Sequence, residues 1–242
     1  MAFPVVEEIT GTTDTSNGTA VVVNYPATVN AGDLLILGMI VDQNTTFTED
    51  GTDTFELTSG ADGSPPARYA IFRKVADGSE GGGTVSFTAV SSVEATAQMY
   101  RIRVGTWEGT LAGGFAIAAS ASNTDDPPNL NPGWGALDIL WIIYGFSSNY
   151  LMGSPSFAAP ANYGNFAARE NNESGAGLPG QCTARRELNA SSENPAAWGG
   201  DVNPNWGITI AVRPAADVGQ PFDLINGLYV PRINGIVNPF VR

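Results

Sequence analysis

The clearest fold signal is the segment Leu34-Leu35-Ile36-Leu37-Gly38-Met39-Ile40-Val41. Gly38 alone interrupts this apolar run of eight residues. The run lacks the alternation of a half-exposed strand, so it predicts a strand in the middle of the structure with both faces buried. Residues 138–146 contain a second such run, Ile139-Leu140-Trp141-Ile142-Ile143-Tyr144. We expect Leu35, Leu37, Leu140 and Ile142 to be almost fully buried.

Shorter strand patterns surround these two runs, with turns rich in Gly, Pro, Asn and Asp between them. They cover Val5–Ile9, Thr19–Tyr25, Tyr69–Ala76, Thr84–Ala89, Ala95–Val104, Gln181–Leu188 and Trp206–Arg213. In the last pattern the even positions are apolar and the odd positions are predicted to point outward, as are Arg101 and Arg103. Amphipathic helix patterns are missing almost everywhere. The sequence therefore predicts an all-β protein with a jelly-roll-like β-sandwich over residues 1–214.

The two halves of this region resemble each other weakly. Each has a turn-rich lead-in (25–33 or 128–138), an apolar run, a glycine-rich polar loop and an alternating strand. This predicts two matched sets of strands that face each other in one sandwich, rather than two separate small domains. Residues 147–180 are rich in Gly, Asn, Pro and Ala, and we expect them to form long surface loops, where recognition usually resides.

Three short motifs are similar to a family of small all-β proteins encoded among bacteriophage structural genes. The motifs are Pro-x-x-Val-x-x-Gly-Asp-Leu-Leu (26–35), Arg-Tyr-x-Ile-x-x-Lys-Val-Ala-Asp-Gly (68–78) and Ile-Ala-Val-Arg-Pro (210–214). The resemblance covers roughly residues 5–214. It implies a virion component, such as a capsid decoration or cement protein or a tail appendage. Members of this family lack shared catalytic residues, so the resemblance assigns none here.

Residues that commonly carry out catalysis are scarce. The chain has no histidine, which removes the commonest general base and metal ligand. Cys182 is the only cysteine and is expected to be a small core residue. Asp50-Gly51-Thr52-Asp53, within an acidic stretch from Asp42 to Glu56, partly resembles a calcium loop but lacks EF-hand spacing. A solvated acidic turn is favoured, with calcium as the alternative, so we expect no cofactor, no catalytic residue and no enzyme activity.

Four tryptophans offer aromatic surfaces on which a sugar could stack: Trp107, Trp134, Trp198 and Trp206. The alternation of its strand places Trp206 in the core. Trp198 lies in a loop and is the best exposed candidate, although sealing the rim of the sandwich is the favoured role.

The formal charge of −13 predicts a surface that repels phosphate backbones, so nucleic-acid binding is not expected. Lys74 is the only lysine among eleven basic residues. The N-terminal residues lack the basic and apolar regions of a classical signal peptide, and no apolar stretch approaches the eighteen or so residues of a membrane span. We therefore expect synthesis in the host cytoplasm, with no membrane span.

The C-terminal residues 215–242 form a predicted extended apolar arm outside the family resemblance. Within it, residues 225–232 and 233–242 form an imperfect tandem repeat, and each copy starts with Ile-Asn-Gly and ends with Arg. Pro231 and Pro239 exclude a helix, and the two Asn-Gly pairs are turn signals. We expect the arm to bind a partner, and the alternative is that it covers an open edge of its own sandwich. The predicted contact residues are Phe222, Leu224, Ile225, Leu228, Tyr229, Val230, Arg232, Ile233, Ile236, Val237, Phe240 and Arg242.

The sequence as a whole favours a bacteriophage virion protein. The leading hypothesis is capsid decoration or cement, with contacts to the major capsid protein, to copies of this chain, or to both. A tail-fibre or baseplate domain that binds host surface glycans is the first alternative. A carbohydrate-active enzyme exported by a non-classical route is the second.

Overall fold

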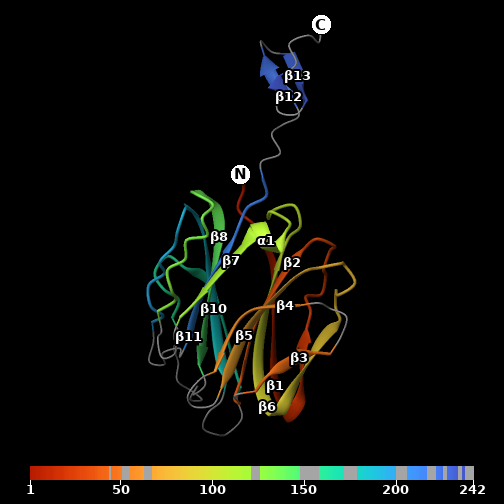
Figure 1. Ribbon diagram of the computed structural model, residues 1–242, viewed down its shortest axis with the longest axis vertical. Helices are drawn as coiled ribbons and strands as arrows, with labels where there is room; N and C mark the ends of the chain where they lie inside the picture. The colour runs from red at the N-terminus through yellow and green to blue at the C-terminus, as the bar shows by residue number, and fades with distance from the viewer. Residues whose placement is uncertain are drawn as a thin grey trace.

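The computed structural model describes residues 1–43, 45–50, 55–62, 67–120, 126–147, 158–171, 179–199, 206–216, 222–225, 228–233 and 236–237. For residues 14–17, 56–62 and those from 222 onward, only the backbone is described. Two antiparallel sheets pack face to face, which confirms the predicted all-β sandwich (Figure 1).

Each sheet is built from one contiguous half of the chain. The first sheet has the order β1 (Val6–Asn24), β6 (Thr84–Ile102), β2 (Leu34–Val41), β5 (Arg68–Val75) and β4 (Glu56–Asp62), with β3 (Phe47–Glu49) also paired to β6. The second has the order β7 (Phe115–Ala119), β11 (Trp206–Val212), β8 (Leu137–Ser147), β10 (Gly180–Ala190) and β9 (Gly164–Glu170). A four-residue helix, α1 (Leu111–Gly114), precedes β7.

The two sheets share one topology. If β3 is set aside, the order in each sheet is first, last, second, fourth and third strand of that half. The apolar runs are the second strand of each half, β2 and β8, and they occupy the centre of their sheets. The predicted correspondence between the halves is therefore present in the strand order. A jelly roll passes between its sheets from strand to strand, whereas here each half stays in one sheet, so the jelly-roll connectivity is wrong.

Three apolar layers explain why the central strands show no alternation. Leu34 and Ile36 lie in the layer between the sheets with Leu140 and Ile142, while Leu35 and Leu37 lie in a layer on the outer face of the first sheet. The ends of β1 and β6 fold over that outer face. A third layer, around Trp141, lies on the outer face of the second sheet. All four leucine and isoleucine side chains predicted to be core are at most 1% exposed, as expected.

Several sequence predictions differ from the structure in their extent. Val5–Ile9 and Thr19–Tyr25 are the two ends of the single strand β1, because the polar segment between them stays paired to β6 with register shifts. The segments 84–89 and 95–104 are likewise joined in β6. The strands β3, β4, β7 and β9 were not predicted, and β9 lies inside the segment expected to be a loop.

The predicted outward faces of two strands are also wrong. Arg101 on β6 is buried because it pairs with a buried carboxylate, whereas Arg103 is exposed as predicted. On β11, Gly207 and Thr209 lie beneath residues 126–128, and the hydroxyl of Thr209 donates to the carbonyl of Pro128 at 2.7 Å. The face of each strand that alternation assigns to solvent is therefore buried at these positions.

The C-terminal residues form a third sheet rather than a fully extended arm. β12 (Phe222–Ile225), β13 (Leu228–Ile233) and β14 (Ile236–Val237) pair antiparallel in chain order. Ile225 pairs with Leu228 and Ile233 with Ile236, so only two residues separate each pair of strands, as the Asn-Gly signals predict. Among the described residues these strands pair with one another and with no edge strand of the sandwich. We call residues 222–237 the C-terminal meander.

Candidate functional site

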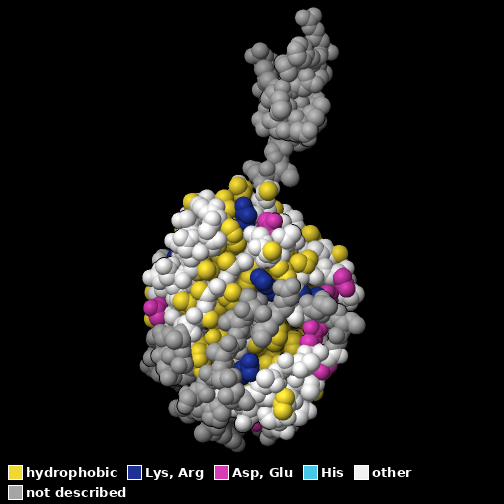
Figure 2. Space-filling view, viewed as in Figure 1, with side chains coloured by type: hydrophobic (Ala, Val, Ile, Leu, Met, Phe, Trp, Pro, Cys, Tyr) yellow, Lys and Arg dark blue, Asp and Glu magenta, His cyan; other side chains and the backbone are white. Residues whose placement is uncertain are grey.

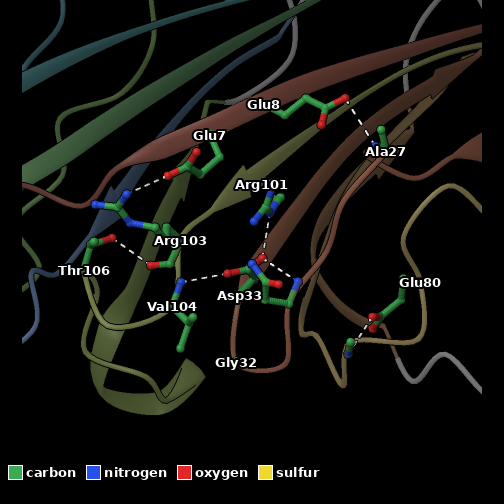
Figure 3. A network of polar contacts seen from close by, with 12 residues as sticks. Glu7, Glu8, Ala27, Gly32, Asp33, Glu80, Arg101, Arg103, Val104 and Thr106 are labelled. Carbon is green, nitrogen blue, oxygen red and sulfur yellow. Dashed lines mark hydrogen bonds and ion pairs between the residues drawn. The ribbon is translucent and has the colours of Figure 1, made fainter.

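The first of the motifs that carry the family resemblance ends in a network of polar contacts around Asp33 (Figure 3). The carboxylate of Asp33 is fully buried and accepts from Nε of Arg101 at 2.6 Å. It also accepts from the backbone N–H groups of Asn30 and Val104, both at 2.8 Å. Asp33 therefore joins the turn before β2 to the end of β6. This carboxylate is fully used in holding the fold together, so it is not free for chemistry.

The second motif contributes a similar turn beside the first. Nζ of Lys74 lies 2.9 Å from Oε1 of Glu80, and both side chains are buried. The Glu80 carboxylate also accepts from the backbone N–H groups of Asp77 and Gly78. Burial acts to raise the pKa of Glu80, but the hydrogen bonds from Lys74 and the backbone outweigh it, so the pKa lies below the ordinary value of 4.5. The single lysine of the chain is thus structural.

In the acidic stretch that partly resembles a calcium loop, the carboxylates of Asp42, Glu49 and Asp50 accept hydrogen bonds from different donors. Asp42 accepts from the backbone N–H of Glu94, and Glu49 from that of Phe55. Asp50 accepts from the hydroxyls of Ser86 and Thr88. Asp53 and the side chain of Glu56 lie outside the described residues. Within the described part of the chain, no group of three or more His, Cys, Asp or Glu residues could hold a metal ion.

The aromatic and thiol candidates lie mostly in the core. Trp107, Trp198 and Trp206 are at most 3% exposed, and Trp198 belongs to the apolar layer on the outer face of the second sheet. Trp134 is partly buried beneath the guanidinium of Arg213. Cys182 is fully buried, as expected, and burial raises the pKa of its thiol. None of these side chains offers a flat exposed platform for a sugar.

An apolar pocket of about 500 Å³ opens between β3 and β5. Phe47, Phe55 and Phe72 line it, and Glu49 and Arg68 are the charged residues of its wall. Figure 2 shows the face on which β5 and β7 lie, where apolar side chains gather next to basic ones. Because the ring of Phe55 stacks on Tyr25 and meets Phe72 edge to face, the pocket continues the outer apolar layer of the first sheet.

Polar side chains, rather than the apolar layer described above, lie between the sheets where β6 and β1 face β10 and β9. Gln98 on β6 and Gln181 on β10 are at most 1% exposed, and neither side-chain amide has a hydrogen-bond partner among the described residues. The hydroxyl of Tyr100 donates to Oγ1 of Thr183 at 2.9 Å across the same space. Buried amides are normally hydrogen-bonded, so we expect ordered water in this polar layer.

Arg185 lies where this polar layer reaches the surface. Two adjoining grooves, of about 220 and 340 Å³, share Arg185 and Asn165 in their walls. Among the described residues the Arg185 guanidinium makes no hydrogen bond or ion pair, and its buried Nη1 has no acceptor. Burial raises the pKa of Tyr100 to about 12, against the opposing effects of Thr183 and of the Arg185 charge. An arginine left unpaired at the mouth of a polar layer is a candidate anion site.

The walls of these grooves are unusual in backbone and charge. Asn162 and Asn165 both adopt positive φ angles, of 69° and 52°. Asn165 lies where β9 has an extra residue relative to β10, at a bulge on an edge strand. Glu7, Glu8 and Glu187 complete the acidic part of the walls. Sequence reasoning missed this region, although the Arg185-Arg186 doublet in a chain of net negative charge is a signal that could have indicated it.

The predicted contact residues of the arm fall into two sets by strand register. Alternate residues of a strand lie on opposite faces, and paired residues share a face. One face of the meander therefore has Phe222, Leu224, Tyr229, Pro231, Ile233 and Ile236. The other has Asp223, Ile225, Leu228, Val230, Arg232 and Val237. Every residue of the first set is apolar, and the second set carries both charges. Phe240 and Arg242 lie outside the described residues.

Comparison with known protein families, curated proteins and solved structures found no match to this chain. The resemblance to phage structural proteins rests on the three sequence motifs alone. No helix in the described part of the chain is long and apolar enough to cross a membrane.

Proposed function

We propose that this chain is a structural protein of a bacteriophage particle, a capsid decoration or cement protein that binds the major capsid protein through its C-terminal meander. The observation that carries the proposal is the register of β12, β13 and β14, which gives the meander one face of six apolar residues. A three-stranded sheet of this size buries little by itself. An apolar face on it gains free energy only when another surface covers it.

The distribution of charge supports an external partner. Residues 222–242 contain two arginines and one aspartate, so they carry +1, while the whole chain carries −13 and the remaining residues therefore carry −14. The strongly acidic body keeps neighbouring copies apart in solution. The meander lacks that repulsion and combines apolar residues with Arg232, which suits a contact with a protein surface that bears carboxylates.

The mode of binding fits a protein that adds to a finished shell. The meander is one continuous segment at the end of the chain, connected to the sandwich by residues 217–221. A short peptide-like element of this kind can dock on a shell while the sandwich folds independently. The family resemblance points to the same class of protein, and the buried polar contacts of its motifs support a structural body rather than a reacting centre.

Deletion of residues 221–242 tests the proposal. Particles of the virus that encodes the chain, stripped of the native protein, are mixed with the full chain or with the truncated chain and sedimented. We expect saturable binding of the full chain and at least about tenfold weaker binding of the truncated chain. The melting temperature of the sandwich should stay within a few degrees. If the truncated chain binds equally well but unfolds more easily, the meander covers its own sandwich and the proposal is wrong.

A further inference from the structure

The grooves at Arg185 form a binding site that is separate from the meander. We propose that they bind a sugar that carries one carboxylate, such as a uronic or sialic acid, with the carboxylate on Arg185. This proposal does not depend on the proposed function, because the grooves lie between β1, β9 and β10 and contain no residue of the meander.

The guanidinium of Arg185 has no partner among the described residues. Arg186, the next residue, pairs with Glu193 at 2.9 Å, and Arg103 pairs with Glu7 at 3.0 Å. Arg185 pairs with no described carboxylate, although it lies among Glu7, Glu8 and Glu187. Its Nη1 is buried, so bulk water does not replace the missing acceptor. A planar carboxylate accepts two parallel N–H bonds from a guanidinium and satisfies this group best.

The surrounding carboxylates restrict what that anion can be. Glu7 already accepts from Arg103, and one oxygen of Glu8 faces the backbone N–H of Ala27 at 3.4 Å (Figure 3). Glu187 is exposed at the rim. Three negative charges repel a polyphosphate, a nucleic acid or an acidic peptide. They accept hydrogen bonds from hydroxyl groups, so the favoured ligand has a single negative charge and several O–H donors.

The remaining walls match a small polar ring. Asn162 and Asn165 offer amide groups that donate and accept, and the structure gives neither side chain a hydrogen bond with a described residue. The two grooves, of about 220 and 340 Å³, have room for one or two sugar rings. The bulge at Asn165 fixes this wall in an uncommon backbone conformation. A polar, partly acidic groove around an arginine with no partner among the described residues matches the chemistry of a sugar acid.

The test uses the full chain and four probes: glucuronate, N-acetylneuraminate, glucose and acetate. Binding is followed by chemical-shift changes of backbone amides in NMR titrations. We expect at least one of the two acidic sugars to bind saturably with a Kd on the order of 1 mM, with shifts on β9 and β10. Glucose and acetate should each bind at least about tenfold more weakly.

Two variants complete the test. Arg185→Gln should weaken binding of the acidic sugar at least about tenfold. Arg169→Gln is the matched control, because Arg169 lies on β9 and lines neither groove, and it should bind as the unchanged chain does. Equal loss in both variants would overturn the proposal, as would equal binding of glucose. Acetate binding as tight as the sugars would show a site for any carboxylate, protein side chains included, and would also overturn it.

Discussion

Asp33 and Arg101 form a buried ion pair, and Arg103, just beyond the end of β6, forms an exposed one with Glu7. The side chains of Asp33 and Arg101 are 0% and 9% exposed, against 32% and 50% for Glu7 and Arg103. Loss of one partner from a buried pair leaves an uncompensated charge, whereas water replaces a lost partner at the surface. The two arginines therefore offer a matched comparison.

We predict that Arg101→Met lowers the free energy of unfolding by about 3–5 kcal/mol, because Asp33 stays buried without its partner. Arg103→Met should change it by less than about 1 kcal/mol. Denaturant unfolding followed by tryptophan fluorescence measures both. Similar costs for the two variants would show that Asp33 is not the buried centre of the turn network.

The carboxyl group of Glu80 makes the free energy of unfolding depend on pH in the acidic range. Its pKa in the folded chain lies below 4.5, so the folded state holds its proton more weakly than the unfolded state does. Its contribution to stability is therefore present above pH about 4.5 and is lost as the pH falls through the lower, folded pKa. We predict that Glu80→Gln is less stable at pH 7 but loses less stability than the unchanged chain on acidification to pH about 3. Urea unfolding at both pH values tests this, and parallel losses in the two proteins would contradict it.

The two sheets approach each other closely at Gly38 on β2. A Cβ atom added there would meet a ring carbon of Tyr144 on β8 at 2.3 Å. The Tyr144 hydroxyl donates to the carbonyl of Gln98, which holds the ring against the first sheet. Gly38, the one glycine in the apolar run of β2, is therefore the position at which the ring of Tyr144 fits between the sheets.

Gly38→Ala should destabilise the chain by about 1–3 kcal/mol, because the ring has to move within a packed layer. Gly164→Ala is the control, since its added Cβ meets nothing within 4 Å. Thermal unfolding of the two variants compares them directly. A Gly38→Ala variant as stable as the control would mean that the sheets are less tightly packed at this point.

The meander offers a second matched pair of substitutions, at two neighbouring residues of one strand. Leu224 and Ile225 are neighbours on β12 but belong to opposite faces by register. If the all-apolar face docks on the capsid, Leu224→Ser should weaken co-sedimentation with particles at least about tenfold, and Ile225→Ser should have a smaller effect. If both variants lost binding equally, the two faces of the meander would not differ in function, and the proposed contact through the all-apolar face would be wrong.

Sequence patterns predict strands and turns well where the pattern of apolar residues matches the buried positions directly. The two apolar runs predict β2 and β8 and their burial, and the Asn-Gly pairs predict the two-residue connections of the meander. Patterns fail where one layer covers another: the outer layers bury Thr209 and Arg101, which alternation assigns to solvent. They also fail for Arg185, because only the packing of β10 against β6 shows that its guanidinium is partly buried and has no partner among the described residues.

At the scale of the whole molecule, the sandwich consists of two sheets with one strand order, each from half of the chain. The sequence predicts this correspondence from its repeated lead-in and apolar run, because both halves need a central strand buried on two sides. The sequence does not predict which face of each sheet packs against the other sheet. The polar and apolar parts of the layer between the sheets depend on pairing between strands that are far apart in the sequence. In the described part of the chain, buried contacts hold the sandwich together, and the two polar grooves at Arg185 lie beside β9 and β10.

We propose that this chain binds a capsid through its meander. Electron cryomicroscopy of phage particles assembled with the chain tests the proposal directly. We predict density for the sandwich at regular positions on the shell, connected to the major capsid protein by a small three-stranded sheet whose all-apolar face is covered. Density at the tail, or a capsid-bound sandwich whose meander contacts nothing, would contradict it.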